Sequence, residues 1–299
     1  MSSFKSGFIA IIGRPNVGKS SLLNSLLNTK VAITSPKPET TRSRILGVLN
    51  KTDQYQLVFV DTPGINEQFN LLDQKINEVT ISSLEGNDLI YYVVDQAYHK
   101  KDEAIINLFK RLDTPIYLIV NKIDLLKGKQ GIDKIILSFL DKFPFEAVIP
   151  VSAKDKTYLN RLIEITVNLL EDDGVMFFPD DYLTNQSDAL MISELIREKI
   201  LNLTEKEVPY ATTVIIETLD YNEEFKTYDV NASIIVERDS QKKILIGKNG
   251  EKIKQIGTEA RKDINQVLET RVHLDLFVKT KKDWRNNPVK LKSYGIGEY

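Results

Sequence analysis

The sequence predicts an α/β domain with a mostly parallel six-stranded sheet, followed by a smaller α+β domain. In the first 170 residues, apolar strand-like runs alternate with amphipathic helical segments, which is typical of a parallel sheet covered by helices on both faces. In the second half the order changes to helix, strand, strand, helix, helix, strand. Because 299 residues can form two cores, we expect one domain over residues 1–172, a linker over 173–182 and a second domain over 183–299.

The composition excludes several classes of protein. The chain has no cysteine, which excludes a disulfide scaffold and a cysteine-ligated zinc or iron–sulfur site. Its first residues lack the apolar core of a signal peptide, and no apolar run approaches the roughly 18 residues that a membrane-spanning helix needs. We expect a monomeric, cytoplasmic protein and leave peripheral contact with the inner face of the cell membrane open.

The net charge of −2 conceals an asymmetry along the chain. Residues 240–299 hold 14 Lys and Arg against 7 Asp and Glu, whereas residues 1–239 hold 26 against 35. A basic segment at the end of an otherwise acidic chain suggests a polyanionic partner. A solvated basic face without a partner is the alternative.

The elements of the first domain follow from hydrophobic periodicity and from residues that break it. Polar residues 50–54 between two strand-like runs predict a hairpin, and the prolines of residues 35–42 predict a loop. The expected strands are 8–12, 45–49, 56–60, 89–94, 116–120 and 147–151, and the expected helices are 19–27, 71–84, 101–112 and 158–170. Ligands of such sheets bind at the carboxyl ends of the strands.

Residues 13–20, Gly-Arg-Pro-Asn-Val-Gly-Lys-Ser, lie between the first strand and the first helix. Gly13 and Gly18 allow backbone angles and close approaches that a Cβ would block. Successive N–H groups and the helix N-terminus can then face a phosphate. Lys19 would meet the β- and γ-phosphates, and the Ser20 hydroxyl would ligate Mg²⁺. The alternative is an exposed turn that matches this pattern by chance.

Two further loops suit the same ligand. Asp61 and Gly64 belong to the run Asp-Thr-Pro-Gly that follows the third strand. Asp61 would hold Mg²⁺, usually through water, and the Gly64 N–H would reach the γ-phosphate. Threonine hydroxyls in the loop 35–42 could complete the Mg²⁺ coordination when a γ-phosphate is present.

The run Asn-Lys-Ile-Asp at residues 121–124 indicates which base is bound. The Asp124 carboxylate can accept hydrogen bonds from the N1–H and the exocyclic amino group of guanine. Adenine offers neither donor and would leave the carboxylate unpaired. The Lys122 stem can lie against the ring, and Asn121 can connect the loops around the base. A turn or helix cap is the alternative role for Asn and Asp here.

The last strand runs into Ser152-Ala153-Lys154, where the Ala153 N–H would meet guanine O6 and Lys154 would stack nearby. With this run, residues 7 to about 170 resemble a translation-factor-type GTPase domain, with the motifs of that family in order. The resemblance implies GTP hydrolysis with Mg²⁺ and two switch loops that the γ-phosphate orders. The residues expected to contact nucleotide are Gly13, Arg14, Pro15, Asn16, Val17, Gly18, Lys19, Ser20, Ser21, Asp61, Thr62, Pro63, Gly64, Asn121, Lys122, Asp124, Ser152, Ala153 and Lys154.

One position departs from Ras-like enzymes, which carry a glutamine directly after D-x-x-G to orient the attacking water. This chain has Ile65 there and resembles the subgroup with a hydrophobic residue at that position. In parts of that subgroup the asparagine that matches Asn16 helps to hold a K⁺ ion in place of an arginine finger. We therefore expect slow hydrolysis, K⁺ as a candidate cofactor, and no side chain that serves as a general base.

The second half contains a G-x-x-G turn between two helical segments. The expected elements are a helix over 190–203, strands over 212–218 and 228–236, the turn at 247–250 and a strand over 272–278. Without side chains at Gly247 and Gly250, the backbone can lie against a sugar–phosphate strand, and lysines supply charge. The order of elements resembles a type II KH domain, which implies RNA binding; a plain helix–turn–helix linker is the alternative. The residues expected at the RNA are Lys243, Ile246, Gly247, Lys248, Asn249, Gly250, Lys252 and Lys254.

A GTPase domain followed by a type II KH domain resembles the Era family, the bacterial GTPases of small-ribosomal-subunit assembly. Residues 13–20, 39–42 and 241–250 carry this resemblance. It implies binding near the 3′ end of 16S ribosomal RNA on the 30S subunit. It also implies that Thr41 is the switch threonine and a Mg²⁺ ligand, with Thr40 as the alternative. Asn16, Lys19, Thr41 and Gly64 are then the expected catalytic residues.

The sequence also leaves two other hypotheses about the function open. The protein could be an RNA-binding scaffold whose nucleotide site is regulatory or a relic, or an RNA-modifying enzyme with a GTPase module. The second half shows no clustered catalytic residues for the latter. His99 and His273 are isolated, so we expect each to be a solvent-facing or strand residue and not a catalytic one. Trp284, in the basic tail, could stack on a base or pack the tail onto the domain.

Overall fold

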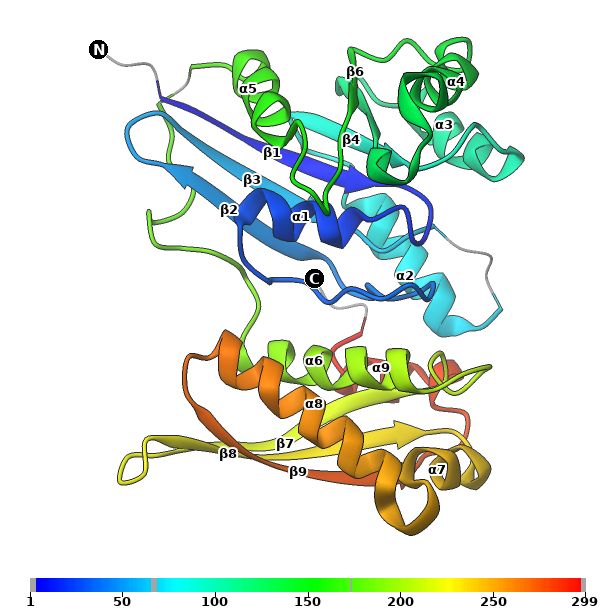
Figure 1. The fold of residues 1–299 in the computed structure, drawn as a ribbon, viewed down its shortest axis with the longest axis vertical. Coiled ribbons are helices and arrows are strands. Elements are labelled where there is room, and N and C mark those ends of the chain that lie inside the picture. Colours follow the sequence, from blue (N-terminus) through cyan, green and yellow to red (C-terminus); the bar gives the residue numbers. More distant parts are fainter. Residues whose placement is uncertain (1–3, 66–68, 173, 297–299) are drawn as a thin grey trace.

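Figure 1 shows the computed structural model of the chain, which describes residues 4–65, 69–172 and 174–296 in two domains, one above the other. Residues 1–3, 173 and 297–299 belong to the predicted domains and linker but lie outside the described residues. No helix within the described ranges is long and apolar enough to cross a membrane.

The N-terminal domain is built on a six-stranded sheet with the strand order β2-β3-β1-β4-β5-β6. β2 pairs antiparallel with β3, and the other neighbouring pairs are parallel. The prediction of a mostly parallel six-stranded sheet is therefore confirmed. The strands are β1 (Lys5–Ile12), β2 (Ile45–Lys51), β3 (Tyr55–Asp61), β4 (Leu89–Val94), β5 (Ile116–Val120) and β6 (Ala147–Pro150).

Helices cover both faces of this sheet, because alternate strand residues enter two separate cores. α1 (Lys19–Leu27) and α5 (Leu159–Leu169) pack on one face. α3 (Glu103–Phe109) and α4 (Gly128–Leu140) pack on the other. The carboxyl ends of β1, β3, β4 and β5 stay free of these helices and carry the loops of the site.

Two elements of this domain differ from the sequence prediction. The sequence predicts no element over residues 125–146, yet they contain α4, whose Ile135 and Phe139 are buried four residues apart. The predicted helix over 101–112 is shorter, because the turn η1 (Lys100–Asp102) precedes α3 and bends the chain into it. His99 is exposed, as predicted, and it caps this turn by accepting a hydrogen bond from the Lys101 N–H.

The C-terminal domain places three helices on one face of a three-stranded sheet with the order β7-β8-β9. β7 and β8 form an antiparallel hairpin, and β9 lies parallel to β8. This confirms the predicted smaller α+β domain. Its elements are α6 (Asp188–Leu203), β7 (Thr213–Asn222), β8 (Thr227–Val236), α7 (Asp239–Ile246), η3 (Lys248–Gly250), α8 (Glu251–Val267) and β9 (Arg271–Thr280).

The basic tail folds back over the other face of this sheet through η4 (Trp284–Asn286) and α9 (Pro288–Ser293). Trp284 is fully buried there, and its indole N–H donates to the Ala211 carbonyl over 3.0 Å. Of the two alternatives for Trp284, packing of the tail is therefore correct and stacking on a base is wrong. His273 stays exposed on β9, near the carboxylates of Asp229 and Asp275.

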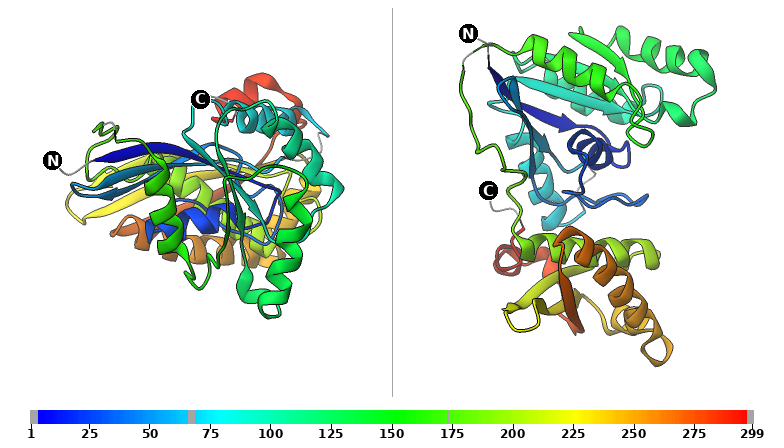
Figure 2. Two further views of the ribbon diagram at one scale, coloured as in Figure 1. Left: turned by 90° about the horizontal axis from the view of Figure 1, so that it is seen from above. Right: turned by 60° about the vertical axis from the view of Figure 1, so that its left-hand side comes forward.

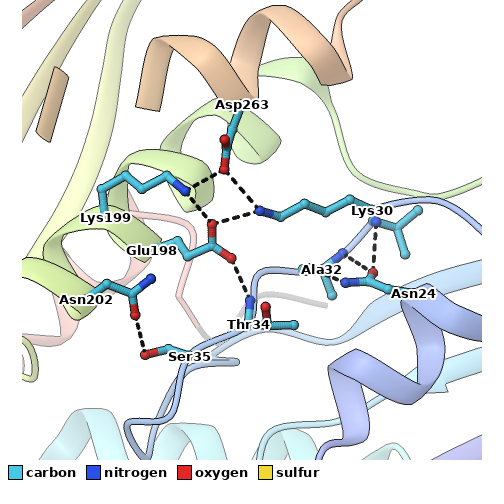
Figure 3. Close-up of polar contacts among 10 residues, drawn as sticks. Asn24, Lys30, Ala32, Thr34, Ser35, Glu198, Lys199, Asn202 and Asp263 are labelled. Atoms are coloured by element: carbon cyan, nitrogen blue, oxygen red, sulfur yellow. Dashed lines mark hydrogen bonds and ion pairs between the residues drawn. The ribbon is translucent and has the colours of Figure 1, made fainter. Parts of the chain in front are cut away.

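The two domains meet at α6, which faces the N-terminal domain and lies beneath the loop that joins α1 to β2 (Figures 1 and 2). Figure 3 shows polar contacts of this interface, in which Lys30 and Lys199 share the carboxylates of Glu198 and Asp263 over 2.5–3.3 Å. A second, apolar contact joins α2 (Leu71–Ser82) to the tail through a cluster that includes Leu72 and Trp284.

Candidate functional site

The loop between β1 and α1 has the close backbone approaches that its glycines predict. A Cβ on Gly13 would lie 2.3 Å from the Val93 carbonyl oxygen. Gly18 has a φ of +94°, and a Cβ there would lie 2.4 Å from Asn121 Nδ2. Residues with side chains are excluded at both positions, so the loop can bring its N–H groups close to a ligand.

Lys19 is a buried cation at the start of α1. Its ammonium donates to the carbonyls of Gly13 and Arg14, both over 3.1 Å. Burial lowers the pKa of Lys19 to about 8, against the opposing effect of the Asp61 charge. Two neutral carbonyls compensate a buried ammonium poorly, so an anion such as a phosphate would stabilise its charged form.

Three oxygen-bearing side chains converge beside Lys19. Ser20 Oγ lies 2.8 Å from Thr41 Oγ1 and 2.7 Å from Asp61 Oδ2. Asp61 is fully buried, and within the described residues its Oδ1 has no hydrogen-bond partner. Burial raises the pKa of Asp61 to about 6, although the Lys19 charge and hydrogen bonds from Ser20 and Thr41 oppose this shift. A carboxylate and two hydroxyls are hard oxygen ligands of the kind Mg²⁺ prefers.

The loops at the carboxyl ends of β5 and β6 are tied to the phosphate loop. Asn121 is buried, donates to the Val17 carbonyl over 2.9 Å and accepts from the Ala153 N–H over 3.1 Å. Asp124 is exposed and accepts from Ser152 Oγ over 2.6 Å. Its carboxylate is thus held in place while remaining open to a ligand.

Two lysines frame this part of the site. Lys122 spans from its loop to Asp95 Oδ2, at 2.7 Å, and to the Asn16 carbonyl. Lys154 is exposed one residue beyond Ala153. Both are placed where they could contact the ring of a bound base.

A cavity of about 420 Å³ connects the predicted phosphate, metal and switch residues. The predicted residues that line it are Asn16, Gly18, Lys19, Ser20, Ser21, Thr40, Thr41, Gly64 and Lys122. Sequence reasoning missed five further lining residues, Ile33, Thr34, Ser35, Pro36 and Glu39. Their place just before the switch threonine is the signal that could have identified them.

Some predicted nucleotide residues point their side chains elsewhere. Arg14 Nε lies 3.0 Å from the buried Asp102, behind the loop. Val17 is buried in the core, and Thr62 Oγ1 donates to the Ile11 carbonyl over 2.8 Å. Pro15 packs close to Gly64, and the Pro63 carbonyl accepts from Thr80. At Arg14 and Val17 only the backbone is left to contact a nucleotide. Pro15 and Pro63 have no N–H, and the Thr62 N–H donates to the Ile11 carbonyl over 3.4 Å.

Of the two candidate threonines, Thr41 is the one beside Ser20 and Asp61. Thr40 Oγ1 instead donates to the Lys37 carbonyl over 2.7 Å, within its own loop. Asn16 Nδ2 donates to the Pro36 carbonyl over 2.7 Å, so the phosphate loop and the loop before Thr41 are in direct contact.

The G-x-x-G turn lies between α7 and α8, at the far end of the C-terminal domain from the N-terminal domain (Figure 1). Gly247 has a φ of +73°, and a Cβ there would lie 2.7 Å from Lys252 Cβ. Lys248 and Asn249 are exposed at the tip, as is Lys243 one turn earlier. Lys252 Nζ donates to the Leu203 carbonyl over 3.1 Å, so this lysine is held within the fold.

A groove of about 360 Å³ lies between α8 and β9, and its lining begins at Ile253, three residues after the G-x-x-G turn. On α8 the residues at spacings of four line it, and a Cβ on Gly257 would lie 3.3 Å from the Leu276 side chain. Lys254 was predicted here, whereas the other lining residues were missed: Ile253, Gly257, Thr258, Arg261, Leu274 and Leu276. The spacing of four from Ile253 through Gly257 to Arg261, on the helix that follows G-x-x-G, is the signal that could have indicated them.

Comparisons with known proteins agree with this geometry. Residues 8–122 match the family model described as 50S ribosome-binding GTPase, and residues 207–285 match the KH domain model. The chain is 43% identical to GTPase Era of Thermoanaerobacter sp. (strain X514), over 97% of this chain and 96% of that protein. It is 42% identical to GTPase Era of Geobacter sp. (strain M21), over 98% of each.

Two solved structures superpose over nearly the whole chain. One is an Aquifex aeolicus Era variant bound to GDP·AlF₄⁻, with a TM-score of 0.94 and 37% identity over 97% of this chain and 99% of that one. The other is Era in complex with MgGDPNP and nucleotides 1506–1542 of 16S ribosomal RNA, with a TM-score of 0.94 and 37% identity over 98% and 99%. On this sequence identity, sustained across both domains, the chain belongs to the GTPase Era family.

Proposed function

We propose that this protein binds and hydrolyses GTP with Mg²⁺, and that it binds 16S ribosomal RNA near its 3′ end to assist assembly of the 30S subunit. The convergence of Lys19, Ser20, Thr41 and Asp61 in one buried cluster carries the first part. The groove beside the G-x-x-G turn and the RNA complex of the solved Era structure support the second.

Each residue of the cluster has a role in this proposal. Lys19 neutralises charge on the β- and γ-phosphates, and the N–H groups of the loop and of Gly64 hold the phosphate oxygens. Ser20, Thr41 and Asp61 hold Mg²⁺, which offsets the negative charge of the transition state. Ile65 packs against the apolar core on the α3 face, so the attacking water must be oriented by backbone or by a bound partner.

Guanine selectivity is assigned to Asp124. Its exposed carboxylate is oriented by Ser152 and can accept two hydrogen bonds from guanine, which adenine cannot supply. Asn121 sets the distance between this carboxylate and the phosphate loop, because it bridges Val17 and Ala153. The Ala153 N–H and Lys154 complete the contacts to the base.

The RNA site is assigned to the turn and the groove. Gly247 and Gly250 let a sugar–phosphate backbone approach, and Lys243, Lys248 and Lys254 supply charge. The groove, which has apolar and basic residues in its wall, accepts unpaired bases. Ile246 ends α7 directly before the turn, and Asn249 adopts a φ of +52° within it. Lys252 would have to leave the Leu203 carbonyl to reach RNA.

Three finer points belong to the same proposal. The domain limits are 1–172 and 183–299 with the linker 173–182 between them. The protein acts as a monomer in the cytoplasm, where its proposed RNA partner is found, and peripheral membrane contact stays a prediction. The family resemblance at Asn16 supports K⁺ as an additional cofactor, and a comparison of turnover in K⁺ and in Na⁺ tests it.

The test measures nucleotide turnover and RNA binding separately. Turnover of GTP and of ATP is compared at saturating Mg²⁺, in K⁺ and in Na⁺. Binding of a labelled oligonucleotide from the 3′ end of 16S ribosomal RNA is compared with a scrambled sequence. We expect GTP-specific turnover and sequence-specific RNA binding. RNA binding without GTP turnover would instead support the scaffold alternative.

A further inference from the structure

The loop that carries the switch threonine is held by helix α6 of the C-terminal domain (Figure 3). The Thr34 N–H donates to Glu198 Oε1 over 2.8 Å, and Ser35 Oγ donates to Asn202 Oδ1 over 2.9 Å. Further along the loop, Lys37 donates to the carbonyl of Thr204, the residue that follows α6. The loop therefore runs along the C-terminal part of α6, with contacts in the same order in both segments.

Arg197 makes the contacts nearest to Thr41. Its side chain is 1% exposed, and its guanidinium forms a bidentate ion pair with the Glu194 carboxylate over 2.6 and 2.8 Å. Its remaining N–H groups donate to two consecutive backbone carbonyls of the loop, those of Glu39, at 3.4 Å, and Thr40. A planar guanidinium can serve both partners at once, which a lysine ammonium at the same place could not.

The residue after Thr41 is anchored in the same domain. Arg42 is buried, and it donates to the carbonyls of Thr212 over 2.8 Å and of Tyr210 over 3.0 Å. Thr41 itself thus lies between two attachments to the C-terminal domain, while its hydroxyl reaches Ser20. Since the Thr40 carbonyl belongs to the peptide plane that ends at Thr41, holding that carbonyl restricts where the Thr41 Cα can lie.

We propose that Arg197 is a positioning residue of the GTPase site, supplied by the C-terminal domain, which holds the Thr40 carbonyl so that Thr41 stays beside Ser20 and Asp61. This inference rests on the proposed function. It assigns part of the order in the nucleotide site to a residue more than 150 positions away in the sequence, in the domain proposed to bind RNA.

A role in general domain contact would have different consequences. If Arg197 only joined the domains, its loss would lower stability but leave nucleotide preference and Mg²⁺ requirement unchanged. If Arg197 positions Thr41, its loss should weaken binding of GTP and of the Mg²⁺ bound with it. Binding of GDP should stay intact, because Thr41 is proposed to bind Mg²⁺ only when a γ-phosphate is present.

The experiment uses the full chain with Arg197→Gln, and Lys199→Gln as the matched control. Lys199 lies two residues along the same helix, also loses one positive charge, and contacts Glu198 and Asp263 rather than residues 39–42. Four quantities are measured for each: affinity for GDP, affinity for a non-hydrolysable GTP analogue, kcat for GTP, and the Mg²⁺ concentration that half-saturates turnover.

For Arg197→Gln we expect kcat to fall about tenfold and the half-saturating Mg²⁺ concentration to rise several-fold. Affinity for the GTP analogue should fall by about the same factor as kcat, while GDP affinity stays within about twofold of the native value. Lys199→Gln should match the native protein in all four quantities.

Native kcat and native Mg²⁺ dependence in Arg197→Gln would overturn the inference, and the proposed function would stand because the native protein still turns over GTP. Absence of turnover in the native protein would instead remove the proposed function. If Arg197→Gln does not fold, the double variant with Glu194→Gln and Arg197→Gln is measured in the same assay. It removes both partners of the ion pair and so leaves no unpaired carboxylate at Glu194. Glu194→Gln alone is then its control.

Discussion

Nucleotide binding should take up a proton at Lys19 when the pH is near 8. Burial lowers the pKa of this ammonium to about 8, so in the free protein about half of the molecules carry a neutral Lys19 at pH 8. A phosphate beside it would raise the pKa again towards its ordinary value, because an opposite charge favours the protonated form. Binding should then absorb about half a proton at pH 8 and about three quarters at pH 8.5.

Isothermal titration calorimetry measures this uptake directly. GDP with saturating Mg²⁺ is titrated at each pH in two buffers with different ionisation enthalpies, and the difference in heat gives the number of protons exchanged. Lys19→Arg is the control, since its guanidinium stays charged throughout this range and should bind GDP without the uptake. A native uptake near zero at pH 8.5 would show that Lys19 is not the buried phosphate contact described above.

Three further predictions follow from the site and the fold. Asp124→Asn should lower the affinity for GDP and raise that for xanthosine diphosphate, because the amide can donate to the oxygen that replaces the guanine amino group; unchanged preference would remove Asp124 from the base site. Gly247→Asp with Gly250→Asp should abolish binding of the 16S oligonucleotide and spare GDP binding, with Gly86→Asp, another left-handed surface glycine, as control; retained RNA affinity would place the RNA site elsewhere. Trp284→Ala should lower the free energy of unfolding by about 3–5 kcal/mol in urea denaturation, because it empties the centre of the tail cluster, and a change below about 1 kcal/mol would contradict that packing.

The nucleotide motifs were predictable from sequence because each is a short run between a strand and the next element. The strand–loop–helix order around Gly13 and Lys19 requires only local periodicity and two glycines. The same holds for Asp61 at the end of β3 and for Asn121 after β5. Parallel strands have their carboxyl ends at the same edge of the sheet, so the sequence also predicts that these motifs lie together there.

The contacts between domains were not predictable in this way. In the sequence, Arg197 is one of several charged residues on an amphipathic helix. Only the packing of α6 against the loop before Thr41 shows that Arg197 binds the Thr40 carbonyl. Trp284 is similar, because a tryptophan in a basic tail suits a base as well as a core until its surroundings are known. Arg14 faces Asp102 because the loop turns it away from the cavity, which its place in the motif does not reveal.

Coupling between the two domains is tested by measuring GTP turnover with and without the oligonucleotide from the 3′ end of 16S ribosomal RNA. We expect this RNA to raise turnover, whereas a scrambled sequence should not, and the variant with Gly247→Asp and Gly250→Asp should show no rise. If the native protein binds the RNA while turnover stays unchanged, the two sites do not communicate in the way that the contacts of α6 imply.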